Sequence, residues 1–389
     1  MNQGKYIFAQ LTEFLPRRKF DRIVRKYNGN KYVRSFTCWN QMLCMVFGQL
    51  TARESMRDLM LSLEPHQPKY YHLGFGKTIS RRNLGRANNN RNYKIFEEFA
   101  YTLIDQARKS CYKDDFEIKV EGNVYALDST TVDLCLSVFW WAKFRKAKGG
   151  IKLHTLYDTK TSVPAFLYIS EARLHDVKVL DIIEYETGSF YVMDKAYIDF
   201  ERLYTINQEK AFFVTRAKNN MRFKRMYSST ADKDNGIKYD QIGKLTGVNS
   251  KRYYPDKIRR VKYFDRENDR TFIFLTNNMD LDATEVAALY KKRWEVELFF
   301  KWVKQHLKIK SFWGTSPNAV KVQIYCAIIA YCLVAICGNK LKSERKIYEI
   351  LQILSISLLD KTSVKEILRD HNYKNDKEPI RKQLRIKGF

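Results

Sequence analysis

Two aspartates close short hydrophobic runs that have the composition of β-strands. Asp128 ends the run Val124-Tyr-Ala-Leu-Asp, and Asp194 ends the run Phe190-Tyr-Val-Met-Asp. Ligands gather at the carboxyl ends of strands in α/β sheets. Two carboxylates placed there can share one or two hard divalent cations. Each aspartate taken singly is more often a turn former or a helix cap, so a further carboxylate is needed to support a site.

That carboxylate lies on a predicted long helix over about 283–306. Tyr290, Arg293, Glu297 and Lys304 are spaced by three, four and seven residues. At about 100° per residue they share a helix stripe roughly 60° wide. Glu295 falls on the opposite side, so Glu297 is the carboxylate expected to join the two aspartates.

The alternative for this stripe is an exposed helix face with i,i+4 ion pairs. Four aromatic residues argue against it, because they indicate that much of the helix is buried: Trp294, Phe299, Phe300 and Trp302.

Three carboxylates with two metal ions suit the cleavage of phosphodiesters. Two ions about 3.5–4 Å apart activate the attacking oxygen and stabilise the leaving oxygen. Arg293 would clamp a phosphate through its fork and Lys304 as a point charge. Tyr290 would hold a phosphate or stack near the cleaved end.

The charge balance points to a polyanionic partner. Seventy Lys and Arg stand against 43 Asp and Glu, which gives a net charge of +27 and a pI of about 9.6. Such an excess is usually matched to nucleic acid. A membrane surface is the rival polyanion, but no basic amphipathic helix stands outside a globular context. A basic protein without a nucleic-acid partner is the remaining alternative.

The pattern Tyr290-x2-Arg293-x3-Glu297-x6-Lys304 resembles the signature of the insertion-sequence-4 family of DDE transposases. Asp128 within LDST and Asp194 within DKAY resemble the other two acidic motifs of that family. The chain departs from many members after the second aspartate, where Lys195-Ala196 replaces Arg-Gly. We expect a local difference in the turn and no loss of metal binding.

The resemblance implies an α/β fold: a ribonuclease-H-like mixed sheet flanked by helices, with a β-rich insertion and an all-α N-terminal DNA-binding domain. It implies Asp128, Asp194 and Glu297 as catalytic metal ligands, with two Mg²⁺ per site that Mn²⁺ can replace. It also implies that Tyr290, Arg293 and Lys304 contact the transposon end during a DNA-hairpin step.

Changes of pattern along the chain predict three parts. Residues 1–115 form a helical domain that recognises DNA ends. Residues 120–338 form the catalytic domain, with the β-rich insertion at about 217–270. Residues 339–389 form a helical tail that is a candidate for dimerisation.

The N-terminal part is predicted to hold helices over 8–25, 37–49, 51–63 and 93–108, with a capping box at Thr51-Ala-Arg-Glu54. Ser80 precedes an arginine-rich short helix that carries Arg81, Arg82 and Arg86. Two apolar helices followed by a polar one suggest a helix-turn-helix-like module whose arginines bind DNA. A solvated surface helix is an equally good interpretation.

Two places are candidates for receiving a base flipped out of the DNA, as the resemblance implies. Trp140 and Trp141 lie beside the basic run 143–148, and core packing is the likelier role for at least one of them. The insertion offers Tyr253, Tyr254 and the basic run 257–262. The sequence does not decide between the two places.

Other residues carry weaker signals. His154 and His175 are candidate phosphate or supporting contacts, but structural roles are favoured. The seven cysteines include no CxxC pair and indicate reduced core thiols. No signal peptide is expected, and the apolar run 324–337 suits a buried helix better than a membrane span.

The sequence therefore predicts a cytoplasmic bacterial transposase that performs cut-and-paste transposition. Its partners would be the terminal inverted repeats and target DNA, bound by a homodimer. A metal-dependent endonuclease without strand transfer is one alternative. A catalytically idle DNA-binding protein is another, which the intact acidic and basic positions disfavour.

Overall fold

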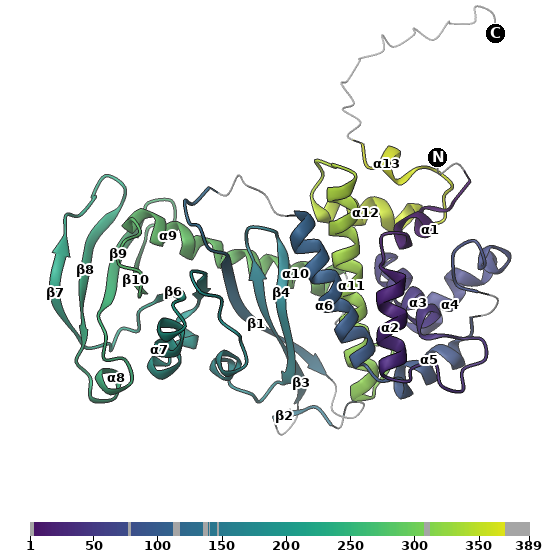
Figure 1. The fold of residues 1–389 in the computed structure, drawn as a ribbon, viewed down its shortest axis with the longest axis horizontal. Coiled ribbons are helices and arrows are strands. Elements are labelled where there is room, and N and C mark those ends of the chain that lie inside the picture. Colours follow the sequence, from purple (N-terminus) through teal and green to yellow (C-terminus); the bar gives the residue numbers. More distant parts are fainter. Residues whose placement is uncertain are drawn as a thin grey trace, which may run out of the picture.

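The computed structural model describes residues 4–76, 79–111, 117–134, 139, 141–145, 148–306 and 312–369. Figure 1 shows a long sheet with helices on both sides and a helical assembly at one end. The helical elements are α1 (Ile7–Thr12), α2 (Arg17–Lys26), α3 (Cys38–Leu50), α4 (Met56–Leu63), η1 (Glu64–Lys69), α5 (Arg81–Asn90), α6 (Lys94–Cys111), η2 (Asp176–Asp181), η3 (Lys195–Tyr197), α7 (Phe200–Gln208), α8 (Val248–Tyr253), α9 (Ala283–Lys292), α10 (Trp294–His306), α11 (Pro317–Lys340), α12 (Ile347–Ser357) and α13 (Val364–Ile367). The strands are β1 (Val124–Leu134), β2 (Lys143–Arg145), β3 (Lys148–Asp158), β4 (Val163–Glu171), β5 (Phe190–Met193), β6 (Phe212–Arg216), β7 (Phe223–Ser229), β8 (Ile237–Leu245), β9 (Ile258–Asp265) and β10 (Arg270–Thr276).

The core of the sheet has the order β4-β3-β1-β5-β6. Strands β1, β3 and β4 form an antiparallel meander, and β5 and β6 run parallel to β1. Parallel neighbours need a crossover connection, and η2 and α7 lie in the two connections here. This mixed sheet flanked by helices is a ribonuclease-H-like arrangement, as expected.

The predicted β-rich insertion continues the same sheet. β10 pairs antiparallel with β6, and β9, β8 and β7 follow in that order to the far edge. In the sequence β10 is the last strand of the insertion, and it extends to Thr276, beyond the expected limit of 270. The insertion is therefore joined to the catalytic sheet by main-chain hydrogen bonds.

Alternation along β1 divides its side chains between the two faces of the sheet. Ala126 packs in the core on the side of α10, whereas Tyr125 and Leu127 pack in the core that α7 covers. Since successive side chains of a strand point to opposite faces, Asp128 lies on the α10 side. Ser129 lies on the other side.

The helix α11 runs through the centre of the helical assembly. It packs against α6, α3, α5 and α12, and its residues share one core with α1–α6. This helix is long and apolar enough to cross a membrane by composition, but 94% of its most apolar stretch is buried inside the protein. The expected buried helix over 324–337 is confirmed.

The last described segment packs against the first one. The N–H groups of Ile7 and Phe8 donate to the carbonyls of Asp360 and Leu358, both at 2.9 Å, and Gln10 Nε2 donates to Thr362 O at 2.7 Å. The predicted tail over 339–389 thus contributes α12 and α13 to the N-terminal core. Its residues 370–389 lie outside the described part of the chain.

Two local predictions in the N-terminal part were wrong. The expected helix over 8–25 is broken at Pro16, whose missing N–H cannot continue α1, so that α2 starts anew. The expected capping box at Thr51 is absent, because Thr51 ends α3 and donates its hydroxyl to Phe47 O. Ser55 caps α4 instead.

The long helix expected over 283–306 is two helices that follow one another along the sheet (Figure 1). They meet at Arg293, whose N–H bonds to Tyr290 O at 3.1 Å. A bond to the third preceding residue tightens the turn locally.

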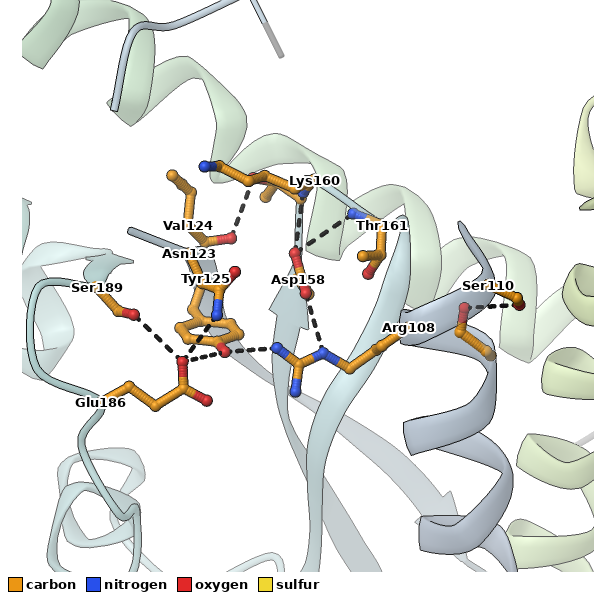
Figure 2. A network of polar contacts seen from close by, with 12 residues as sticks. Arg108, Ser110, Asn123, Val124, Tyr125, Asp158, Lys160, Thr161, Glu186 and Ser189 are labelled. Carbon is orange, nitrogen blue, oxygen red and sulfur yellow. Dashed lines mark hydrogen bonds and ion pairs between the residues drawn. The ribbon is translucent and has the colours of Figure 1, made fainter. Parts of the chain in front are cut away.

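A polar network attaches α6 to the sheet (Figure 2). Arg108 Nε donates to Asp158 Oδ2 at 3.0 Å, and Arg108 Nη2 donates to the Tyr125 hydroxyl at 2.6 Å. That hydroxyl donates to Glu186 at 2.7 Å. Helix α6 is thereby linked to β1, to β3 and to the loop before β5.

Candidate active site

Three polar residues form a row across the middle of β1 and the carboxyl ends of β5 and β6. Asp128 was expected to close its strand, but β1 continues to Leu134, because residues 129–134 go on pairing with β3. Leu127 pairs with Met193, and Met193 pairs with Thr215, in parallel register. Each next position is polar: Asp128, Asp194 and Arg216. Neighbouring strands lie about 4.8 Å apart, so the sheet itself brings the two carboxylates and the guanidinium together on one face.

Each aspartate is held by the main chain that follows it. Asp128 Oδ1 accepts the Ser129 N–H at 2.8 Å, and Asp194 Oδ1 accepts the Lys195 N–H at 2.6 Å. Asp194 also accepts two bonds from Arg216, from Nη2 at 2.7 Å and from Nε at 3.2 Å. Both carboxylates are therefore fixed in direction.

Arg216 was not among the residues singled out in the sequence. The available signal was its position, because it closes the run Phe212-Phe-Val-Thr-Arg216 as the aspartates close theirs. The sequence does not show that β6 pairs with β5, so this position alone could not place Arg216 beside Asp194.

Helix α10 supplies the third carboxylate from above the sheet. Arg293 Nη1 lies 2.6 Å from Glu297 Oε1 and 3.6 Å from Asp128 Oδ2. The structure thus brings Asp128, Asp194, Arg293 and Glu297 to one place. Glu295 contacts Lys292 at 3.3 Å and points elsewhere, as expected from the helix geometry.

Tyr290 lies in the same place, largely buried. Its ring packs 4.8 Å from that of Phe274, and the guanidinium groups of Arg216 and Arg293 each lie 5.8 Å from its centroid. Neither its hydroxyl nor Arg293 Nε has a hydrogen-bond partner of normal geometry among the described residues. Buried donors without partners are costly, so both are suited to an incoming ligand.

Lys304 lies farther along the same helix. Its Nζ donates to Thr131 O on β1 at 2.9 Å. This contact places the ammonium group beside the same strand, beyond Asp128. The predicted stripe therefore faces the sheet, with Tyr290 on Phe274 of β10 and with Arg293 and Lys304 beside β1.

The pKa values of the two aspartates are shifted in opposite directions. Burial raises the pKa of Asp128 to about 6, and the nearby Glu297 and Asp194 carboxylates add to the rise while Arg293 opposes it. Burial also disfavours charge on Asp194, but the hydrogen bonds from Arg216 and Lys195 outweigh it and lower its pKa. Asp128 is thus the carboxylate that gains most from a cation.

The donor set fits a hard divalent cation in chemistry. Carboxylate oxygens are the ligands that Mg²⁺ and Mn²⁺ prefer. Burial is the main cause of the raised pKa of Asp128, and the nearby Glu297 and Asp194 carboxylates add to it. Within the described ranges, no three Asp, Glu, His or Cys side chains are close enough to form a metal-binding group as they stand. Arg293 bridges two of the three carboxylates and occupies the place of a counter-ion.

The opposite face of β1 carries a supporting polar cluster. Ser129 Oγ donates to Asp176 at 2.6 Å, and Lys152 Nζ lies 3.0 Å from the same carboxylate. His154 is fully buried there, with Nε2 at 2.9 Å from Ser170 Oγ, and burial lowers its pKa to about 4. His154 is therefore a neutral structural residue. His175 precedes η2 without a capping bond from its side chain.

The candidates for a flipped base are placed unequally. Trp141 donates Nε1 to Thr315 O at 2.8 Å and packs on Phe139, whereas Trp140 lies outside the described residues. In the insertion Tyr254 is a core residue and Arg259 is buried in a pair with Asp240. Those two residues of the predicted DNA surface are not available to DNA.

The arginine-rich helix forms as expected, capped by the Ser80 hydroxyl, which accepts the Asn83 N–H. Arg81, Arg82 and Arg86 are all exposed on it. Each described cysteine is a free thiol, and Cys135 lies outside the described part.

The chain is similar to known transposases over most of its length. The family described as a transposase DDE domain matches residues 120–333, and a family described only as a domain of unknown function matches residues 3–76. A protein of Sinorhizobium fredii assigned as transposase y4zB is 32% identical over 74% of this chain and 80% of its own length. Proteins assigned as transposases for the insertion sequence elements IS5377 of Geobacillus stearothermophilus and IS4SA of Synechocystis are 30% and 27% identical, over 66% and 76% of this chain and 66% and 82% of their own lengths. The chain therefore belongs to the DDE transposase family, among the bacterial insertion-sequence transposases.

Proposed function

We propose that this protein cuts an insertion sequence out of DNA and joins it into a new site, with Asp128, Asp194 and Glu297 as the catalytic acids. One observation carries the proposal. Asp128 within β1 and Asp194 just after β5 lie on neighbouring strands, opposite a glutamate that shares an arginine with Asp128. The helix motif supports assignment to the insertion-sequence-4 group.

The residues of the chain have distinct tasks in this reaction. The three carboxylates would hold two Mg²⁺ ions, or Mn²⁺ in their place, which activate the attacking oxygen and stabilise the leaving one. Arg293 and Lys304 bind phosphate oxygens, and the Tyr290 hydroxyl donates to the DNA end. Arg216 keeps Asp194 charged and oriented. Water attacks first and a freed 3′-hydroxyl attacks later at the same site.

The partners are the terminal inverted repeats of the element and a target DNA. The N-terminal helices up to about residue 115 recognise the ends, and a homodimer holds one end in each site. The residues after about 338 are the candidate dimer contact. Because the substrate is chromosomal DNA, the protein works in the bacterial cytosol.

The test is incubation of the purified protein with Mg²⁺ and labelled DNA carrying the ends that flank its gene. Asp128→Asn is expected to reduce excision and joining by at least about a hundredfold, the scale reached when a metal centre loses a supporting group. Asp133→Asn is the matched control, because Asp133 is an exposed acid on the same strand. Chelation of the divalent ions is expected to stop both steps and leave end binding in place.

Cutting without joining would replace the proposal with a nuclease. End binding with neither step would indicate an idle recognition protein. Equal activity of Asp128→Asn and Asp133→Asn would show that Asp128 is not a catalytic acid and would contradict the proposed active site.

A further inference from the structure

The segment between α2 and α3 faces α5 across an open groove of about 530 Å³. Lys31, Arg34, Arg86 and Arg91 line this groove, and no Asp or Glu lines it among the residues that the structure describes. A concave surface with only cationic charge concentrates a positive field and attracts a polyanion. The row of Asp128, Asp194 and Arg216 lies elsewhere, on β1 and at the ends of β5 and β6.

Arg91 is a half-buried cation in the groove. Its guanidinium donates to Gln41 Oε1 at 3.0 Å and to the carbonyl of Phe36, and it lies 5.6 Å from the Phe36 ring. These partners are neutral, and no ion pair within the described residues includes Arg91. A half-buried cation held by neutral groups retains its attraction for an incoming phosphate.

The face that α5 turns to the groove carries groups that recognise base edges. Asn83, Arg86, Ala87 and Asn90 line the groove, at positions i, i+3, i+4 and i+7 of the helix. Asparagine pairs with adenine and arginine with guanine in the major groove, and a small apolar side chain accommodates the thymine methyl group. Arg81 and Arg82 lie on the same helix but do not line the groove.

Tyr32 stands at the rim of the groove in a strained backbone. Its side chain is 92% exposed, and its φ is +60°. Tyrosine rarely adopts positive φ, and such strain persists only where the surroundings impose it. Gly29 is pressed against Ile95 and Cys38, and Asn30 Oδ1 accepts the Cys38 N–H at 2.8 Å. The turn is thereby anchored to the core and presents the ring outward.

The end of α5 is rigidly joined to the rest of the protein. Asn318 Nδ2 donates to the carbonyls of Asn88 and Arg91, at 2.8 and 2.6 Å, at the start of α11. A helix fixed at this end holds its exposed face in a defined orientation. Such fixing is what sequence recognition requires of a DNA-binding helix.

We propose that the groove between residues 27–36 and α5 is the sequence-recognition cleft for the DNA ends. Asn83, Arg86 and Asn90 contact base edges, the cations on the opposite wall hold the phosphate backbone, and Tyr32 stacks on a base or sugar at the rim. The inference rests on the proposed transposase function and adds to it the residues that recognise the DNA sequence.

The first experiment measures binding of full-length Glu297→Gln protein, which cannot cut, to end DNA and to scrambled DNA of equal length. Arg86→Ala or Asn90→Ala is expected to lower the ratio of the two affinities by about 5- to 150-fold, the scale of one bidentate base contact. Arg82→Ala is the matched control and is expected to weaken both DNAs alike. RNA duplex of the end sequence is expected to bind without preference, because its major groove is too narrow for a helix.

An unchanged ratio in both groove variants, or an equal change in Arg82→Ala, overturns the recognition cleft. Equal preference for the RNA duplex overturns it as well. A parent protein that prefers neither DNA overturns the proposed function together with the cleft, whereas excision of the ends by wild-type protein with unaffected groove variants overturns the cleft alone.

The second experiment separates a binding role of Tyr32 from a structural one. Tyr32→Gly relieves the positive φ, so the melting temperature is expected to equal or exceed that of the parent, while affinity for DNA ends falls about fivefold or more. Ser162→Gly, at φ +57° in the β3–β4 turn, is the matched control and is expected to leave DNA affinity unchanged. A Tyr32→Gly protein that loses stability, or that binds as the parent does, overturns the role of Tyr32.

Discussion

At the scale of single residues, two arginines hold the acids of the candidate site together. Arg293 touches both Glu297 and Asp128, and Arg216 binds Asp194 through two nitrogens. Three carboxylates in one place repel one another, and two guanidinium groups reduce that repulsion. The two arginines therefore keep the acids oriented.

We expect Arg216→Gln to lower the rate of end cutting by about 10- to 100-fold. Residues that hydrogen-bond to a metal-binding carboxylate, as Arg216 would to Asp194, contribute to activity on that scale. Affinity for end DNA should stay within a few-fold. Arg216→Lys should retain more activity than Arg216→Gln, since it keeps the charge and loses the fork. The measurement is single-turnover cleavage of labelled ends at saturating protein.

Arg222→Gln is the control, because it removes an exposed cation shortly after β6. Wild-type rates in Arg216→Gln would show that Asp194 needs no support from the neighbouring strand.

At the scale of elements, the fold depends on joints that local patterns do not reveal. Pro16 separates α1 from α2, and Arg293 separates α9 from α10. Asp158 at the end of β3 is 1% exposed and accepts from Arg108 of α6 (Figure 2). Its other bonds come from the N–H groups of Lys160 and Thr161.

We expect Arg108→Met to lower the free energy of unfolding by roughly 2–3 kcal/mol, because it removes the charged partner of a buried carboxylate. Lys109→Met should cost less than about 0.5 kcal/mol, since Lys109 forms an exposed i,i+4 pair with Asp105. Chemical denaturation of both variants measures the difference. Equal stability of the two variants would show that the joint between α6 and the sheet does not depend on this ion pair.

At the scale of the whole molecule, chain segments distant in sequence share one core. Helices α1–α6, α11 and α12 pack together, and the sheet extends from that core to β7 at the other end (Figure 1). The chain carries a net charge of +27. Among the described residues, no acid lines the groove between residues 27–36 and α5, and the acids of the candidate site are paired with arginines. DNA binding is therefore expected to be strongly electrostatic.

We expect affinity for end DNA to fall about a thousandfold or more between 50 and 200 mM salt, because at least six phosphate contacts release counterions. The slope should be the same for end and scrambled DNA, since base contacts contribute little to it. Fluorescence anisotropy over a salt series measures both. A flat response would contradict nucleic acid as the partner.

The sequence by itself was enough to locate the strands that carry or precede Asp128 and Asp194, and the helical spacing from Tyr290 to Lys304. Hydrophobic runs and helical spacing are local properties, so Asp128, Asp194 and the stripe from Tyr290 to Lys304 could be found from them. The ribonuclease-H-like sheet followed from the same order of elements together with the family resemblance. The roles of these residues in catalysis stay predictions.

Other features depended on contacts between residues far apart in the chain, which no local pattern contains. The register of the strands made Arg216 the partner of Asp194, and it placed Asp194 beside Asp128. Packing removed Tyr254 and Arg259 from the expected DNA surface and attached the C-terminal helices to the first ones. The turn that carries Tyr32 lies far from α5 in the sequence. The two come together in the fold because Gly29 packs closely against Ile95 and Cys38 and because Asn318 holds the end of α5.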